Sequence, residues 1–98
     1  MPTVTSLDDL DESTHATVFP DDPRTVRLSL DAGESVPEHD HPDTDVLFHV
    51  LSGSFEVTVG DETYAVETGD LLRFDGARSV SPAAVTDATA LVVLAPQR

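Results

Sequence analysis

Apolar and polar residues alternate in short runs along this chain, from near Arg24 to the C-terminal end. Because successive side chains of a β-strand point to opposite faces, such alternation predicts strands with one buried face. No stretch longer than a turn or two has the spacing of an amphipathic helix. The predicted strands cover residues 25–30, 46–51, 54–59, 63–66, 71–74 and 88–95.

Turn residues separate these runs and set their spacing. Gly53 and Gly69 each fall between two runs, and Gly60-Asp61 has the composition of a tight hairpin turn. Repeats of roughly 8–12 residues give about seven to nine short strands, which is the pattern of an all-β sandwich or barrel. Periodicity alone leaves an immunoglobulin-like sandwich and a jelly roll both open.

The first part of the chain differs from the rest. Residues 1–23 are polar and irregular, with an acidic cluster at 8–12 and a turn-rich break at 20–23. A short edge strand is expected at 2–5. We therefore divide the chain into this acidic N-terminal segment and a barrel over 24–98.

The net charge of −14 arises from 19 acidic residues and only five basic residues, all of them arginine. Such a surface repels itself in dilute salt, whereas at ~1 M salt the Debye length falls to about 3 Å and the repulsion is screened. The composition resembles that of halophilic, acidic proteins from salt-accumulating organisms. An acidic disordered chain is the alternative, which the dispersal of the acids among β-patterned residues disfavours. The charge also disfavours nucleic acid as a partner.

Composition excludes several other classes of protein. The chain has no cysteine, so it cannot form disulfides, cysteine-zinc sites or thiol nucleophiles. Its first residues lack the basic and apolar regions of a signal peptide. No apolar run approaches the ~18 residues that a membrane span needs. We therefore expect a cytoplasmic protein with no membrane partner.

Two stretches of the sequence carry a recognisable pattern. The first runs from Gly33 through the pair His39-Asp-His41 to Gly53, and the second begins at Gly69 and continues with an aspartate and apolar residues. Together these stretches resemble the two sequence motifs of the cupin family. The resemblance implies an all-β fold, the double-stranded β-helix or jelly-roll barrel.

The resemblance also implies a metal site in the barrel mouth, at which two of the family's ligands match His39 and His41. Alternate residues of a strand point to the same face, and a divalent transition metal such as Fe, Ni, Mn, Zn or Cu is the expected ion. The family's glutamate and third histidine fall on Val46 and Val80, so the ligand set is incomplete and the metal could be absent. Asp45 is a candidate third ligand if a bulge turns it inward.

Three interpretations of the histidine pair stay open. The imidazoles neutralise nearby carboxylates in a surface loop, line a ligand pocket without a metal, or hold a metal with a third group. Arg73 shares the parity of Leu71, so it is a candidate to point inward and bind a carboxylate ligand. The expected pocket residues are Val46, Phe48, Tyr64, Arg73 and Val80.

Two functions follow from these residues. One is a small metal-dependent enzyme, of the dioxygenase or isomerase type, that acts on a small molecule. The alternative is a non-catalytic barrel that binds or senses a small-molecule ligand. Valine at two ligand positions makes the expected pocket less polar and favours binding over chemistry. The family resemblance further implies a homodimer.

Overall fold

The computed structural model describes residues 2–97, which form short β-strands and a single 3-10 turn. Within this range there is no helix long and apolar enough to cross a membrane. The elements are η1 (Leu7–Asp9), β1 (His15–Phe19), β2 (Arg24–Leu30), β3 (Thr44–Ser52), β4 (Ser54–Val59), β5 (Glu62–Glu67), β6 (Leu71–Asp75), β7 (Val80–Ala84) and β8 (Ala88–Pro96).

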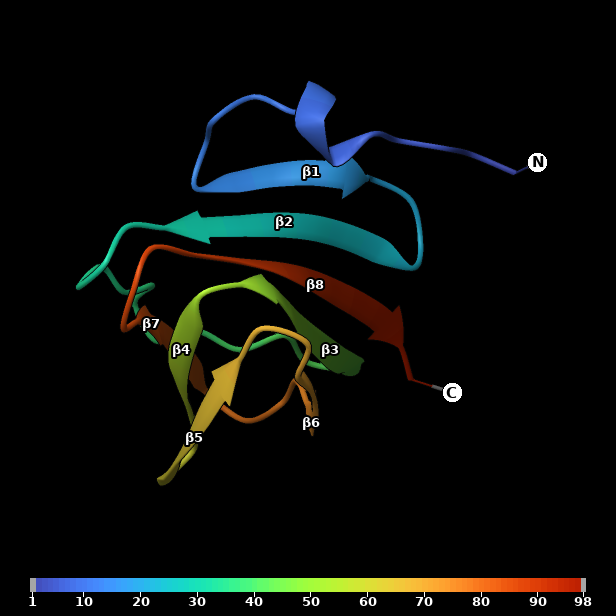
Figure 1. The fold of residues 1–98 in the computed structure, drawn as a ribbon. Helices are drawn as coiled ribbons and strands as arrows, with labels where there is room; N and C mark the ends of the chain where they lie inside the picture. Colours follow the sequence, from blue (N-terminus) through green and yellow to red (C-terminus); the bar gives the residue numbers. More distant parts are fainter. Residues whose placement is uncertain (1, 98) are drawn as a thin grey trace.

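The strands form two antiparallel sheets (Figure 1). The five-stranded sheet has the order β1-β2-β8-β3-β6, and the three-stranded sheet has the order β5-β4-β7. Strands far apart in sequence pair within them: β2 and β8 are in register from Arg24 opposite Leu94 to Leu30 opposite Ala88. This arrangement confirms the predicted all-β jelly-roll fold.

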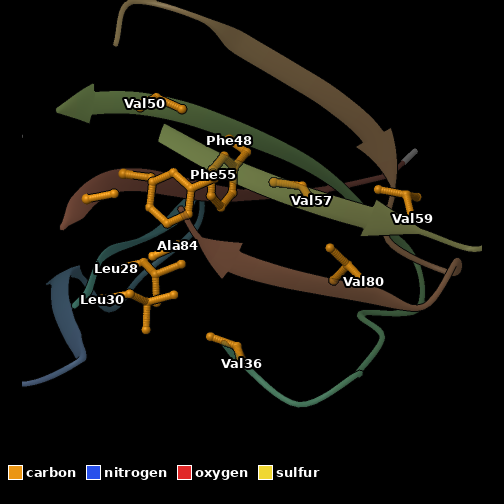
Figure 2. Close-up of a cluster of buried hydrophobic side chains, with 12 residues drawn as sticks. Leu28, Leu30, Val36, Phe48, Val50, Phe55, Val57, Val59, Val80 and Ala84 are labelled. Carbon is orange, nitrogen blue, oxygen red and sulfur yellow. The ribbon is translucent and has the colours of Figure 1, made fainter. Parts of the chain in front are cut away.

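The hydrophobic core lies between the two sheets, where the strands present apolar faces to each other. Phe48 of β3 and Phe55 of β4 meet edge to face, with their ring centroids 5.1 Å apart (Figure 2). Aromatic pairs prefer this geometry because the positive edge of one ring meets the negative face of the other. On the same two strands, Val50 and Val57 are almost fully buried. The core therefore follows the period-two pattern of these strands.

The N-terminal segment contains a strand, but not where the sequence predicts one. Residues 2–5 form no strand, whereas β1 pairs with β2 and forms an edge of the five-stranded sheet. Before β1, the turn η1 lies beside it (Figure 1), and the Arg27 guanidinium donates to the Leu7 carbonyl oxygen at 2.9 Å. The N-terminal segment is therefore built onto the same sheet as the rest of the chain.

The segment between β2 and β3 forms part of the barrel rim. It runs antiparallel to β7, where the Val36 N–H donates to the Pro82 carbonyl oxygen at 2.9 Å. Further along, His39 and Val80 exchange two backbone hydrogen bonds, of 3.1 and 2.8 Å. This pairing covers the edge of β7 and brings His39 and His41 to the rim.

Candidate functional site

A cavity of about 490 Å³ opens between the sheets, beneath the segment that joins β2 to β3. Its volume falls within the range of ~300–1,000 Å³ that is usual for small-molecule sites. Four of its lining residues, Leu28, Val36, Phe48 and Val80, are labelled in Figure 2. The apolar lining residues are Val26, Leu28, Val36, Pro37, Val46, Phe48, Phe74, Val80, Pro82, Val92 and Leu94.

Polar side chains gather at the mouth of this cavity. The rings of His39 and His41 lie edge to face, with centroids 4.8 Å apart and planes at 89°. His39 is exposed and His41 is half-buried, so the pair borders the opening rather than the interior. A ligand could therefore place a polar group against the mouth and an apolar body in the interior. The polar lining residues are His15, Thr17, Arg24, Glu38, His39 and His41.

The His39 ring is oriented by the backbone of its own loop. Its Nδ1 lies 3.0 Å from the Pro37 carbonyl oxygen. Because a carbonyl oxygen can only accept, Nδ1 carries the proton in this contact, and Nε2 of the neutral ring keeps a lone pair. Nε2 of His39 can therefore accept a hydrogen bond from a ligand hydroxyl or amide.

His41 is held in place by the turn after β6. Its backbone N–H donates to the Gly76 carbonyl oxygen at 2.6 Å, and the Gly76 N–H donates to the Thr44 carbonyl oxygen at 2.7 Å. A Cβ atom at Gly76 would collide with the carbonyl oxygens of His41 and Thr44. Glycine is required here because the two backbones approach closely, which no larger residue allows.

The surroundings of the mouth favour neutral imidazoles. Burial lowers the pKa of His41 from its ordinary value of 6.5, and the charges of His39 and Arg24 lower it further, while Asp40 acts in the opposite direction. Burial also lowers the pKa of His15, with a further contribution from His39. A lowered pKa means that the neutral ring predominates at neutral pH.

Three of the predicted pocket residues lie in the cavity wall. Val46 and Phe48 share the inward face of β3, and Val80 begins β7 on the opposite sheet. All three side chains are buried. They supply apolar surface on both sides of the cavity.

The Asp45 side chain does not point toward the histidine pair, as a third metal ligand would have to. It is exposed on the outer face of β3, and its Oδ1 accepts a hydrogen bond from Gln97 Nε2 at 3.0 Å. The pairing of β3 with β8 runs without a bulge from Thr44 to Val50, so nothing turns the carboxylate inward. The prediction of Asp45 as a third ligand beside the histidine pair is therefore wrong.

The placement of Tyr64 and Arg73 in the pocket is also wrong. Tyr64 lies opposite Val57, but its strand β5 is an exposed sheet edge, and its hydroxyl donates to Glu62 at 2.7 Å. Arg73 lies opposite Leu47 and is exposed, because the register of β6 against β3 directs this face away from the cavity. Neither side chain lines the cavity.

The donor set does not fit a metal ion held by the protein. Across residues 2–97, no group of three or more His, Cys, Asp and Glu side chains is placed to share an ion. The positions at which the family resemblance implies further ligands carry Val46 and Val80, whose side chains have no donor atom. His39 and His41 therefore remain a pair above an apolar interior.

Four polar residues of the mouth, His15, Thr17, Arg24 and Glu38, were not predicted from the sequence. His15 belongs to β1 and pairs opposite Leu28, and Arg24 begins β2 opposite Leu94. Arg24 has the parity of Val26 and Leu28, both of which line the cavity. The alternation of β2 therefore contained a signal for Arg24, whereas the position of His15 depends on a pairing that alternation does not predict.

Comparisons with known proteins agree with this fold. The sequence model of the family described as "Cupin domain" matches residues 26–95. A search of curated proteins found no match. An RmlC-like cupin protein from Desulfovibrio desulfuricans is 25% identical, with a TM-score of 0.79, and the match covers 100% of this chain and 99% of that chain. A conserved protein of unknown function from Streptococcus pyogenes is 27% identical, with a TM-score of 0.73. This match covers 86% of this chain and 75% of the streptococcal chain. A conserved protein with a double-stranded β-helix domain from Klebsiella pneumoniae has the same fold at 18% identity, with a TM-score of 0.85. This match covers 100% of this chain and 93% of the Klebsiella chain.

Proposed function

Since this chain belongs to the cupin domain family, and its cavity has apolar walls with a few polar side chains at the mouth, we propose that it is a non-catalytic barrel that binds a small molecule. The ligand places an apolar body between the sheets and a polar group at the mouth. The protein then serves to sense or carry this ligand rather than to transform it.

The observation that carries this proposal is the chemistry of the cavity wall. Inward-facing residues of β2, β3, β7 and β8 make it largely apolar, and its polar lining residues come from β1, the start of β2 and the segment before β3. Burial of apolar ligand surface gives roughly 25 cal/mol per Å², and a few polar groups then fix the orientation. Val46 and Val80 add to this surface at positions where the family resemblance implies charged or polar ligands.

The test uses N-phenylnaphthylamine, an uncharged dye whose fluorescence rises in apolar surroundings. We expect saturable binding of one dye per chain. Val92→Phe should weaken it about tenfold or more, because Val92 lines the cavity and a larger side chain fills it. Val93→Phe is the matched control, since Val93 lies on the outer face of the same strand, opposite Leu47. An absence of saturable binding, or equal effects of the two variants, would contradict the proposal.

The rival function is a metal-dependent enzyme of the dioxygenase or isomerase type, and the adjacent rings of His39 and His41 favour it. Such an enzyme would need groups from outside the protein to complete the coordination of its ion. Metal content separates the two functions. Protein purified without a metal-binding tag should contain much less than one equivalent of Fe, Ni, Mn, Zn or Cu, unchanged in His39→Ala. Near-stoichiometric metal that disappears in this variant would favour the enzyme.

A further inference from the structure

Arg24 occupies a particular place at the cavity mouth. It is the first residue of β2, it lies opposite Leu94 of β8, and both residues line the cavity. By strand parity its side chain leaves the sheet on the same face as Val26 and Leu28, which form the apolar wall below it. Its charge also acts on His41 across the mouth. A guanidinium group is therefore positioned directly above an apolar interior.

Among the described residues, no acidic side chain is placed to neutralise this guanidinium. The chain carries 19 acidic residues, and Asp22 and Asp40 border a neighbouring groove that shares Arg24 as a wall. Even so, within the described residues 2–97 no side-chain hydrogen bond and no ion pair fixes Arg24, whereas Arg27 is fixed by carbonyl oxygens of the N-terminal segment. Because a planar guanidinium offers donors in a fork that matches a carboxylate, an open Arg24 is suited to an anionic group.

We propose that the ligand of this cavity is a small monocarboxylate, whose carboxylate binds Arg24 at the mouth and whose apolar body occupies the space between the sheets. This inference rests on the proposed binding function and adds the chemical class of the ligand. His39 Nε2, with its lone pair, adds an acceptor site for a hydroxyl group on such an acid.

The charges around the mouth limit the ligand to a single negative charge. Among the described residues that line the cavity, Glu38 is the one carboxylate, and Asp40 lies close enough to influence His41. A dianion such as a phosphate monoester would be repelled by these groups while it gained only one guanidinium partner. A monocarboxylate makes the same bidentate contact with Arg24, and its single charge is repelled about half as strongly by Glu38 and Asp40.

The test compares naphthaleneacetate with its uncharged amide, as competitors of bound N-phenylnaphthylamine at one fixed KCl concentration. We expect the carboxylate to bind about tenfold or more tightly than the amide, because a hydrogen-bonded charge pair is lost in the amide. Arg24→Gln should abolish this difference between the carboxylate and the amide. Arg73→Gln is the matched control, since it removes the same charge from the exposed outer face and should leave the difference intact.

The other outcomes would reject the ligand class, the role of Arg24 or the binding function. Equal affinities of the acid and the amide in the wild type would reject the carboxylate class while leaving the binding barrel in place. A difference that persists in Arg24→Gln would also reject the assigned role of Arg24. Failure of both compounds and of the dye to bind would reject the binding function itself.

Discussion

At the scale of residues, the identity of two side chains decides what the histidine pair can do. Val46 and Val80 line the same cavity as His39 and His41, at the positions where the family resemblance implies a glutamate and a third histidine. A valine cannot coordinate an ion, and it adds apolar surface to the wall. The substitution of these two positions therefore accounts both for the incomplete donor set and for the apolar character of the cavity.

If the two valines are what limits metal binding, donor side chains at these positions should introduce it. The double substitution Val46→Glu with Val80→His should give a protein that binds Co²⁺ or Zn²⁺ at least tenfold more tightly than the wild type, because four donor groups would then face one cavity. Val46 is only 2% exposed, so the metal-free variant should be less stable, and added metal should raise its Tm. Calorimetric titration measures the affinity. The same double variant with His39→Ala should lose the gain, and an unchanged affinity would show that the valines are not what limits binding.

The mouth histidines predict a dependence of stability on pH. The pKa of His41 and that of His15 are both lowered from 6.5 in the folded chain, so the unfolded chain takes up protons more readily as the pH falls. The two neutral rings make their full contribution to the free energy of unfolding above about pH 6.5, and this contribution decreases as the pH falls below that value. We expect a lower urea midpoint at about pH 5.5 than at about pH 7.5, and a smaller difference in His41→Gln. An equal difference in both proteins would assign the effect to other groups.

At the scale of elements, alternation predicts which residues share a face but not which face is inside. The strand Leu71–Asp75 has apolar residues on both faces, so its parity left the orientation of Arg73 undetermined. The pairing with β3 decides it, because Leu72 lies opposite Phe48 and Phe74 opposite Val46. Which face of a strand points inward is decided by contacts between segments that are distant in sequence. The local pattern of apolar and polar residues does not contain these contacts.

The same limit applies to the candidate site. His39 and His41 could be located from the sequence because a local motif places them on a rim. β7, by contrast, has the sequence Val-Ser-Pro-Ala-Ala, which has little β-propensity and includes a proline, and it becomes a strand by pairing with β4. His15 reaches the mouth only because β1 pairs with β2. The motif was predictable, whereas the groups that complete the mouth depend on tertiary pairing.

The orientation of β6 can be tested with neighbouring leucines. Leu72 packs against the core, whereas Leu71 is 63% exposed. We expect Leu72→Ala to lower the free energy of unfolding by about 1–3 kcal/mol, and Leu71→Ala to change it by less than about 0.5 kcal/mol. Urea denaturation of the two variants gives both values. A larger loss in Leu71→Ala would mean that β6 presents its other face to the core or that Leu71 is covered by a partner.

At the scale of the whole molecule, the dominant physical quantity is charge. A net charge of −14 is carried by a chain with a radius of gyration of only 12.8 Å. In 0.01 M salt the Debye length is about 30 Å, so every charge in the molecule acts on every other. In ~1 M salt it is about 3 Å, and only immediate neighbours interact. The repulsion that opposes folding should therefore depend strongly on the concentration of salt.

We accordingly predict that the fold is lost or loosened as KCl falls below a few hundred millimolar, because the compact state concentrates unscreened negative charge. Far-UV circular dichroism and Tm, followed against KCl concentration, measure the effect.

A variant with fewer charges provides a control. The substitutions Glu56→Gln, Asp61→Asn, Glu62→Gln and Glu67→Gln remove four exposed charges from the β4–β5 hairpin, and this variant should stay folded at lower salt than the wild type. Sucrose, which does not screen charge, should not replace KCl fully at equal osmolality. A spectrum that is unchanged down to about 10 mM KCl would mean that the apolar core alone outweighs the repulsion, and the acidic surface would then need an explanation other than adaptation to salt.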